Sequence, residues 1–261
     1  MTSSQRSPTP APVALRGFSA VCGFFQRMPQ FHGVQREVMT QLARVATTQT
    51  YERGEHLWRA GDVPVSLMWV KSGLVKLTRL APHGRTALCG LFGAPSNLGE
   101  LALLKGIPFP TNTIAASRSV SVVSIPRSEM MDALHQDPVL CINLLQTIEA
   151  RMAMLHDKID VLSAGTVEAR LATLLLKLYH QFGDDFEDGQ SRIPVPLSRQ
   201  ELADLLATSF ETAIRIASRF ERSGFITTDA DGFAIHDIEA LHRASGLGDG
   251  PNFALPRLRD F

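Results

Sequence analysis

The feature that most constrains this chain is a change of hydrophobic period at Pro138. Before it, from about residue 47 to residue 127, short β-prone runs such as SLMWVKSGLVKLTRL alternate with glycine and proline. That pattern is typical of an antiparallel roll or barrel. After Pro138, apolar residues recur at spacings of four and three, which is a heptad pattern. The heptad stripe consists of Cys141, Leu145, Ile148, Met152, Leu155, Ile159 and Leu162.

The heptad stripe predicts a homodimer. A strict period of about 3.5 residues favours pairing with a second copy, whereas a helix on its own domain drifts toward about 3.6 residues and a broader stripe. We therefore expect a coiled-coil dimerisation helix over residues 138–164. The alternative is a long helix buried within a monomer.

Two short amphipathic helices, separated only by Ala207-Thr208-Ser209, follow in the C-terminal third. Ser198 stands three residues before Glu201, and Thr208 three before Glu211, which is the spacing of a capping box at a helix start. The expected inward faces are Leu202, Leu205 and Leu206 on the first helix, and Ala213, Ile216, Ala217 and Phe220 on the second. The next segment, FITTDADGFAIH, predicts a β-hairpin in the position of a wing, which would add contacts to phosphates.

The outward face of the second helix carries chemistry suited to a DNA major groove. Its residues are Phe210, Glu211, Ile214, Arg215, Ser218, Arg219 and Arg222. A carboxylate accepts a hydrogen bond from the cytosine amino group, and a guanidinium donates two to a guanine edge. The alternative is a solvated ladder of Glu211, Arg215 and Arg219, which stabilises a helix by only about 0.2–0.5 kcal/mol per pair.

The segment LSRQELADLLATSFETAIRIASRFERSGFI resembles the helix-turn-helix of the cyclic-AMP receptor protein and fumarate-nitrate regulator (CRP/FNR) superfamily, with FETAIR in its recognition-helix pattern. GELALL, from residue 99, resembles the start of the family's cyclic-nucleotide pocket. The resemblance covers most of the chain and implies an α+β fold. The expected parts are a disordered arm (1–17), a cyclic-nucleotide-binding-like β-roll sensor domain (18–137), the dimerisation helix (138–164), a winged helix-turn-helix domain (166–245) and a tail (246–261).

The resemblance also implies how DNA is bound. Glu211 and Arg215 would read base edges in each half of a palindromic operator with a TGA-like core. Ile214 stands where the fumarate-nitrate regulator has a small polar residue, and its methyl groups suit thymine methyl contact. The expected partners are double-stranded DNA, a second copy of the chain and RNA polymerase. The expected DNA-binding residues are Ser198, Arg199, Ser209, Phe210, Glu211, Thr212, Ile214, Arg215, Ser218 and Arg219.

The sensor domain departs from both known branches of the family. Pro110 stands where the cyclic-AMP branch has a phosphate-binding arginine, so cyclic AMP is not expected. Only Cys22 lies near the N-terminus, so an iron-sulfur cluster with four thiolates is not expected either. An apolar pocket remains, which leaves haem, a fatty or aromatic effector, or no effector at all. The expected pocket residues are Phe92, Leu98, Gly99, Glu100, Leu101, Leu103, Pro110, Thr111, Leu155 and His156.

His156 is the candidate ligand for a haem iron, because it lies beside the heptad stripe and could reach a neighbouring roll. The alternative is a solvated or hydrogen-bonded histidine, as is usual for a lone histidine on a long helix. Cys89 and His83 are weaker candidates, and a buried strand thiol is the simpler interpretation of Cys89.

Composition excludes several other classes. The chain has 26 basic and 26 acidic residues, so only a local basic surface can indicate nucleic acid. The cysteines have no metal-ligand or disulfide spacing, and no catalytic motif indicates an enzyme. Without a signal peptide or a run of about 18 apolar residues, we expect a cytoplasmic protein. The rival hypothesis is a cyclic-nucleotide-type ligand-binding module that acts through a protein partner without binding DNA.

Overall fold

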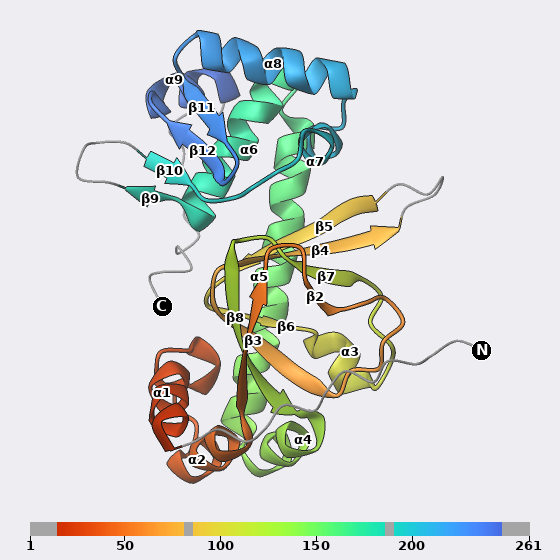
Figure 1. Cartoon of the computed structure of the whole chain (residues 1–261), viewed down its shortest axis with the longest axis vertical. Coiled ribbons are helices and arrows are strands. Elements are labelled where there is room, and N and C mark those ends of the chain that lie inside the picture. The colour runs from red at the N-terminus through yellow and green to blue at the C-terminus, as the bar shows by residue number, and fades with distance from the viewer. Residues whose placement is uncertain (1–14, 81–85, 186–190, 247–261) are drawn as a thin grey trace.

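The computed structural model describes residues 15–80, 86–185 and 191–246 (Figure 1). Most of the expected N-terminal arm, the expected tail from residue 247 onward, and His83 lie outside the described residues. The chain folds into a β-roll and a C-terminal helical unit, and one long helix runs from the first to the second. This arrangement confirms the α+β class that the sequence predicts.

The β-roll consists of two four-stranded antiparallel sheets. Their strand orders are β1-β8-β3-β6 and β2-β7-β4-β5. Between the sheets lies a core that includes Val70, Val75, Phe92 and Val122. Their strand neighbours Leu74, Leu91, Trp69 and Val123 are also buried, but in the clusters on the outer faces of the sheets, because successive side chains of a strand point to opposite faces. The strands are β1 (Thr47–Glu52), β2 (His56–Trp58), β3 (Ser66–Ser72), β4 (Leu74–Leu80), β5 (Thr86–Gly93), β6 (Ser96–Leu98), β7 (Asn112–Ala115) and β8 (Ser119–Pro126).

Helices before and within the roll cover one of its outer surfaces. A second hydrophobic cluster forms there, in which Phe25 stacks on Phe31 with ring centroids 4.3 Å apart and both rings lie near Trp69. The first helix begins at Leu15, so it overlaps the last residues of the expected arm. These elements are α1 (Leu15–Gln26), the 3-10 helix η1 (Pro29–Phe31), α2 (Arg36–Val45), α3 (Glu100–Lys105) and α4 (Arg127–Gln136).

The long helix α5 (Pro138–Ser163) carries two stripes with the same spacing on different faces. The Asp137 side chain caps its start by accepting from the backbone N–H groups of Val139 and Leu140. The inner stripe packs on the roll and on the C-terminal unit, and it consists of Leu140, Leu144, Thr147, Arg151, Met154, Lys158 and Val161. The described side chains of the heptad stripe are exposed, so the alternative of a helix that buries this stripe in a monomer is wrong.

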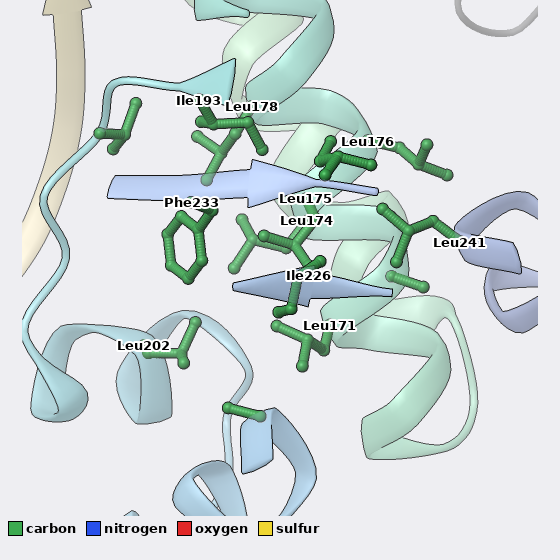
Figure 2. Packing of buried hydrophobic residues seen from close by; sticks show 14 of the residues in the cluster. Leu171, Leu174, Leu175, Leu176, Leu178, Ile193, Leu202, Ile226, Phe233 and Leu241 are labelled. Atoms are coloured by element: carbon green, nitrogen blue, oxygen red, sulfur yellow. The ribbon is translucent and has the colours of Figure 1, made fainter. Parts of the chain in front are cut away.

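The C-terminal unit is built around α6, whose leucines face the hairpin and α7 (Figure 2). Its small sheet has the order β11-β12-β10-β9. Leu171, Leu175 and Ile226 are fully buried at its centre. In the described part of the chain, no helix has both the length and the apolar character needed to cross a membrane. The elements are α6 (Val167–Phe182), β9 (Asp184–Asp185), β10 (Ser191–Ile193), α7 (Arg199–Leu205), α8 (Phe210–Arg222), β11 (Ile226–Asp229), β12 (Gly232–Ile235) and α9 (Ile238–Ser245).

Candidate functional site

The first helix of the pair, α7, has defined bonds at both ends. Ser198 Oγ accepts from the backbone N–H of Glu201 at 3.2 Å, and Glu201 Oε2 accepts from the backbone N–H of Ser198 at 2.7 Å, which is the capping box that the sequence predicts. The helix ends at Leu205, and Ala207, just beyond its C-cap Leu206, has a left-handed φ of 47°. The N–H groups of Ala207 and Thr208 bond back to the last turn, and this arrangement closes the helix tightly.

The second helix, α8, begins one residue later than the capping-box spacing predicts. Ser209, rather than Thr208, is the N-cap, and its Oγ accepts from the backbone N–H of Thr212 at 3.2 Å. The prediction of a Thr208–Glu211 capping box is therefore wrong. The reason is that the backbone N–H of Thr208 already bonds to the Ala203 carbonyl, so Thr208 belongs to the turn that closes α7.

The two helices pack against α6 through the faces that the sequence predicts. Leu202, Leu206, Ala213, Ile216, Ala217 and Phe220 are buried, and Leu205 is half-buried against the same cluster. Arg170 of α6 donates from Nη1 to the Leu206 carbonyl at 3.1 Å. This bond anchors the end of α7 and so fixes the corner between the two helices.

The opposite face of α8 is open to solvent. Phe210 is 42% exposed, Glu211 and Arg215 are exposed, and Thr212, Ile214 and Ser218 are half-buried. Figure 1 shows α8 at the end of the molecule opposite α1 and α2, with the roll between. The expected base-reading side chains therefore share one accessible surface.

Arg219, which the sequence predicts to contact DNA, also contacts the neighbouring helix. Its Nη1 lies 2.7 Å from Glu168 Oε1 on α6, so it joins α8 to the neighbouring helix. Glu211 and Arg215 form no ion pair with any other described residue. The charge ladder along α8 is thus absent from the described structure, and the two side chains best suited to base edges remain available.

Inside the roll, Arg151 of the inner stripe occupies the centre of the expected effector pocket. Its Nε lies 3.1 Å from Glu100 Oε1, it donates to the Asn97 carbonyl, and its guanidinium carbon lies 3.9 Å from the centroid of the Phe92 ring. The Glu100 side chain is only 7% exposed. The buried carboxylate is therefore neutralised and hydrogen-bonded within the protein itself.

The ten expected pocket residues are only partly brought together. Phe92, Leu98 and Glu100 surround Arg151 or the roll core, and Gly99 has a φ of 82° and lies so close to Phe109 that a Cβ would be 2.8 Å from that ring. Pro110 is exposed, and Thr111 is half-buried and accepts from Trp58 Nε1 through its carbonyl.

Four of the expected pocket residues lie elsewhere, and their positions correct the sequence prediction. Leu101 is exposed because the short α3 turns Ala102 and Leu103 inward instead. Leu103 itself packs beneath the N-terminal helices rather than inside the roll. Leu155 and His156 are exposed because they lie on the outer side of α5.

The sequence analysis did not identify Arg151, although a signal was present. The inner stripe repeats at spacings of four and three, one residue out of step with the heptad stripe, and it carries two basic residues, Arg151 and Lys158. Lys158 donates to the Cys89 carbonyl, whereas Arg151 pairs with a carboxylate inside the roll. A half-buried basic residue in a mainly apolar stripe indicates an acidic partner. Glu100, isolated among apolar residues, is the matching acid.

The roll also contacts the C-terminal unit through a half-buried ion pair. Lys76 Nζ on β4 lies 2.8 Å from Glu201 Oε2 at the start of α7, and it also donates to the Pro196 carbonyl at 2.5 Å. Burial alone would raise the pKa of Glu201, but hydrogen bonds from Lys76 and from the Ser198 backbone outweigh burial and lower it. The ion pair therefore favours the charged form of Glu201.

Two hollows lie where the roll meets the C-terminal unit. The more open one, of about 500 Å³, is lined by Thr78, Thr86, Leu88, Ser198, Gln200 and Glu201. The other, of about 80 Å³, lies between β5, α5 and α6, and leucines, Met154 and Val161 line it together with the polar side chains of Asp157, Lys158, Lys177 and Gln181. That volume is well below the roughly 300–1,000 Å³ of typical ligand pockets. No group of three or more histidine, cysteine, aspartate or glutamate side chains positioned to hold a metal ion is found among the residues described.

Comparison with known proteins gives consistent matches to both parts of the chain. Residues 48–137 match the cyclic nucleotide-binding domain family, and residues 169–244 match the Crp-like helix-turn-helix domain family. A CRP-like cAMP-activated global transcriptional regulator of Mycobacterium tuberculosis is 28% identical over 213 residues, which cover 82% of this chain and 94% of the relative. The transcriptional activator protein Anr of Pseudomonas aeruginosa is 29% identical over 200 residues, covering 76% of this chain and 79% of the relative.

A solved structure gives the same result for the fold. The crystal structure of a CRP-family transcriptional regulator from Thermus thermophilus is 25% identical and has a TM-score of 0.62. The match covers 76% of this chain and 97% of the Thermus chain. The order of β-roll, long helix and helix-turn-helix is therefore shared over nearly the whole length of that protein.

We predict that the Lys76–Glu201 ion pair stabilises the fold in a pH-dependent way. Near neutral pH, Glu201→Gln should lower the free energy of unfolding by about 1–2 kcal/mol, because Lys76 loses its charged partner. The pKa of Glu201 is lowered in the folded state, so its contribution is complete above the unfolded pKa and disappears as pH falls through the folded pKa.

Urea unfolding of both proteins between about pH 7 and pH 3 measures this difference. Glu239→Gln, at a highly exposed carboxylate, is the matched control. If the difference in unfolding free energy between wild type and Glu201→Gln stays constant over this pH range, the ion pair does not stabilise the fold in the way predicted.

Proposed function

Because the chain belongs to the CRP/FNR family of transcription regulators, we propose that it is a homodimeric, sequence-specific DNA-binding regulator whose β-roll responds to an effector other than cyclic AMP. The observation that carries DNA binding is the open face of α8. There Glu211 and Arg215 are exposed without an ion-pair partner among the described residues, on a helix capped by Ser209 and anchored by Arg219. A rigid helix with unsatisfied charged groups is suited to enter a major groove.

The base-reading roles follow from the chemistry of the exposed face. Arg215 donates two hydrogen bonds to a guanine edge, and Glu211 accepts from a cytosine amino group. Phe210 and Ile214 present apolar surface to thymine methyl groups, which is compatible with a TGA-like half-site core. Ser198 and Arg199 are exposed at the start of α7 and would approach phosphates.

The heptad stripe supports dimerisation through α5. Leu145, Leu155 and Ile159 are each 58% exposed in the single chain, and Met152 and Leu162 are also exposed. A contiguous apolar stripe of this kind on a soluble surface marks a protein interface. Pairing of two α5 helices would place both α8 helices at the same end of the dimer. Half-sites about 34–36 Å apart on the DNA would then match the two-fold symmetry of the dimer. RNA polymerase is the protein partner that we propose for the DNA-bound regulator.

The roll chemistry supports an effector other than cyclic AMP. Pro110 supplies no guanidinium for a cyclic phosphate, and Glu100 already has Arg151 as its partner. A cyclic nucleotide would therefore have to break a buried ion pair without gaining a phosphate contact at Pro110. The cAMP activation named for the Mycobacterium relative is therefore not assigned to this chain.

Haem does not fit the described residues of one protomer. His156 lies exposed on the outer side of α5, whereas Arg151, Phe92 and Leu98 fill the roll interior. Haem is therefore not part of the proposed function. A small organic effector that rearranges the Arg151–Glu100 pair is the proposal that the roll supports best, and it would act by changing how α5 packs.

The rival function is a ligand-binding module that acts through a protein partner. In that case the exposed side chains of α8 would only be solvated, and their loss would not affect DNA. Two observations favour the regulator. Glu211 and Arg215 have no ion-pair partner among the described residues, and the helix that carries them is held in place by the Ser209 cap and the Arg219–Glu168 ion pair.

Arg215→Ala should weaken binding to a specific operator by about 1–3 kcal/mol and relax the preference at one base of each half-site. Fluorescence anisotropy with operator DNA and single-base variants measures both effects. Arg243→Ala on α9 is the matched control, since it removes an exposed arginine of the same domain away from α8. Equal losses for the two variants, without a change in base preference, would support the rival function.

Leu155→Glu should convert the dimer to a monomer, because it places a charge in the apolar stripe of both copies. Analytical ultracentrifugation measures the mass directly. Val65→Glu provides the control, because Val65 is 72% exposed on the roll and lies outside α5. A Leu155→Glu protein that remains dimeric would show that the two copies associate through another surface.

Cyclic AMP should bind the wild-type protein with a Kd weaker than about 1 mM in isothermal titration calorimetry. Pro110→Arg should improve that affinity by at least about tenfold, because it creates an Arg-Thr pair with Thr111 that can hold a phosphate. Micromolar binding by the wild type would contradict the proposal about the effector.

A further inference from the structure

The tip of the hairpin β11–β12 is bound to the roll by two ion pairs. Asp231 Oδ1 lies 2.5 Å from Arg53 Nη2, and Asp231 Oδ2 lies 2.7 Å from Arg118 Nη2. Arg53 also donates from Nη1 to the Ala230 carbonyl at 3.3 Å. Each carboxylate oxygen thus has its own arginine, and we call this set of Asp231, Arg53 and Arg118 the wing clamp.

The hairpin side of the wing clamp has a fixed shape. Asp229 Oδ1 accepts from the backbone N–H groups of Asp231 at 2.7 Å and Gly232 at 2.9 Å, which holds the turn closed. Gly232 has a φ of 149°, and a Cβ there would lie 2.0 Å from the Ile193 carbonyl oxygen. The turn therefore presents the Asp231 carboxylate in a defined position.

The roll side is also fixed, by strand register. Glu52 at the end of β1 pairs with Ser119 at the start of β8, so the residues just beyond them, Arg53 and Arg118, emerge at the same edge of the sheet. Neither arginine has another acidic partner among the described residues. Two cations from separate strand ends are thus brought to one carboxylate of the other domain.

The wing clamp differs from the role that the sequence predicts for the wing. A wing that touches the DNA backbone should present positive or neutral groups to phosphates, whereas Asp231 carries a negative charge. In this structure the tip contacts the roll instead. Its chemistry is that of a contact between domains.

We propose that Asp231, Arg53 and Arg118 are positioning residues for DNA binding, which hold the helix-turn-helix on the roll in the orientation that α8 needs. The proposal rests on the proposed function. The C-terminal unit packs on the roll through a hydrophobic cluster that includes Leu74, Leu91 and Phe182. The wing clamp and the Lys76–Glu201 pair add directional contacts at two separate points, the hairpin tip and the start of α7, and so restrict rotation about that apolar contact. Because α8 lies at the far end of the molecule, a small rotation at the roll moves its base-reading face by more (Figure 1).

The decisive variant is Asp231→Asn. A charge effect and a loss of positioning predict opposite changes in its affinity for operator DNA. It removes a negative charge from the DNA-binding domain, so a plain charge effect would strengthen attraction to phosphates. Loss of the wing clamp instead leaves the domain less ordered before it binds, which should weaken operator binding about fivefold or more. Asp231→Glu should restore most of the affinity, and Glu239→Gln is a control with the same change of charge in the same domain.

Hydrogen exchange without DNA tests the contact independently of the proposed function. Asp231→Asn should speed exchange at the backbone amides of β11 and β12, whereas Glu239→Gln should not. If the wild type binds no DNA, the proposed function fails, and the exchange measurement still decides whether the contact exists. Arg118→Gln, at a side chain 83% exposed, is the second variant should Asp231→Asn fold poorly.

The proposal is overturned by any of three results. Tighter DNA binding by Asp231→Asn would mean that the wing clamp restrains the domain or acts only through charge. Unchanged exchange would mean that the contact does not hold the hairpin. Faster exchange with unchanged DNA affinity would mean that the contact forms without positioning α8.

Discussion

The structure depends on a single helix, α5, whose inner stripe and heptad stripe have the same spacing and lie one residue out of step. The inner stripe of α5 buries Leu140 and Leu144 beneath the N-terminal helices, reaches the roll through Arg151, and meets the C-terminal unit at Val161. The described side chains of the heptad stripe are exposed along the same helix. Because one rigid rod contacts the roll, the C-terminal unit and the proposed second copy, a change in the packing of either stripe alters the geometry of all three.

Arg151 gives this rod a direct connection to the interior of the roll. Its ion pair with Glu100 and its contact with the Phe92 ring join α5 to the start of α3 and to β5. A buried ion pair adds little net stability, because the desolvation of both charges offsets their attraction. Breaking it is costly, however, so an effector that displaces Arg151 would switch the helix between two discrete arrangements rather than shift it gradually.

The sequence predicted the elements with strong local patterns. The capping box at Ser198, the inward faces of α7 and α8, and the β-rich unit before Pro138 all depend on spacing within a few residues, and the structure confirms them. The start of α8 was misplaced by one residue because Ser209 and Thr208 are both good N-caps. Only the bonds that close α7 decide between them.

Contacts between distant segments could not be read from local spacing. Leu103 was expected in the roll because it is apolar and near Gly99, but it faces a cluster that includes α1 and α2, which lie more than 50 residues away in the chain. The same limit hid the partners of Asp231, because Arg53 and Arg118 meet only through the register of β1 and β8. The buried and exposed faces of α8 were thus predictable from spacing, whereas the interface between domains required the fold.

The central claim is that two copies of α8 read two related half-sites on one face of DNA. Selection of bound sequences from a random duplex pool by the purified protein tests it most directly. We predict enrichment of a palindrome whose half-sites lie about 10–10.5 base pairs apart, centre to centre. Enrichment of a lone half-site would contradict the dimer geometry, and no enrichment over the starting pool would contradict sequence-specific DNA binding itself.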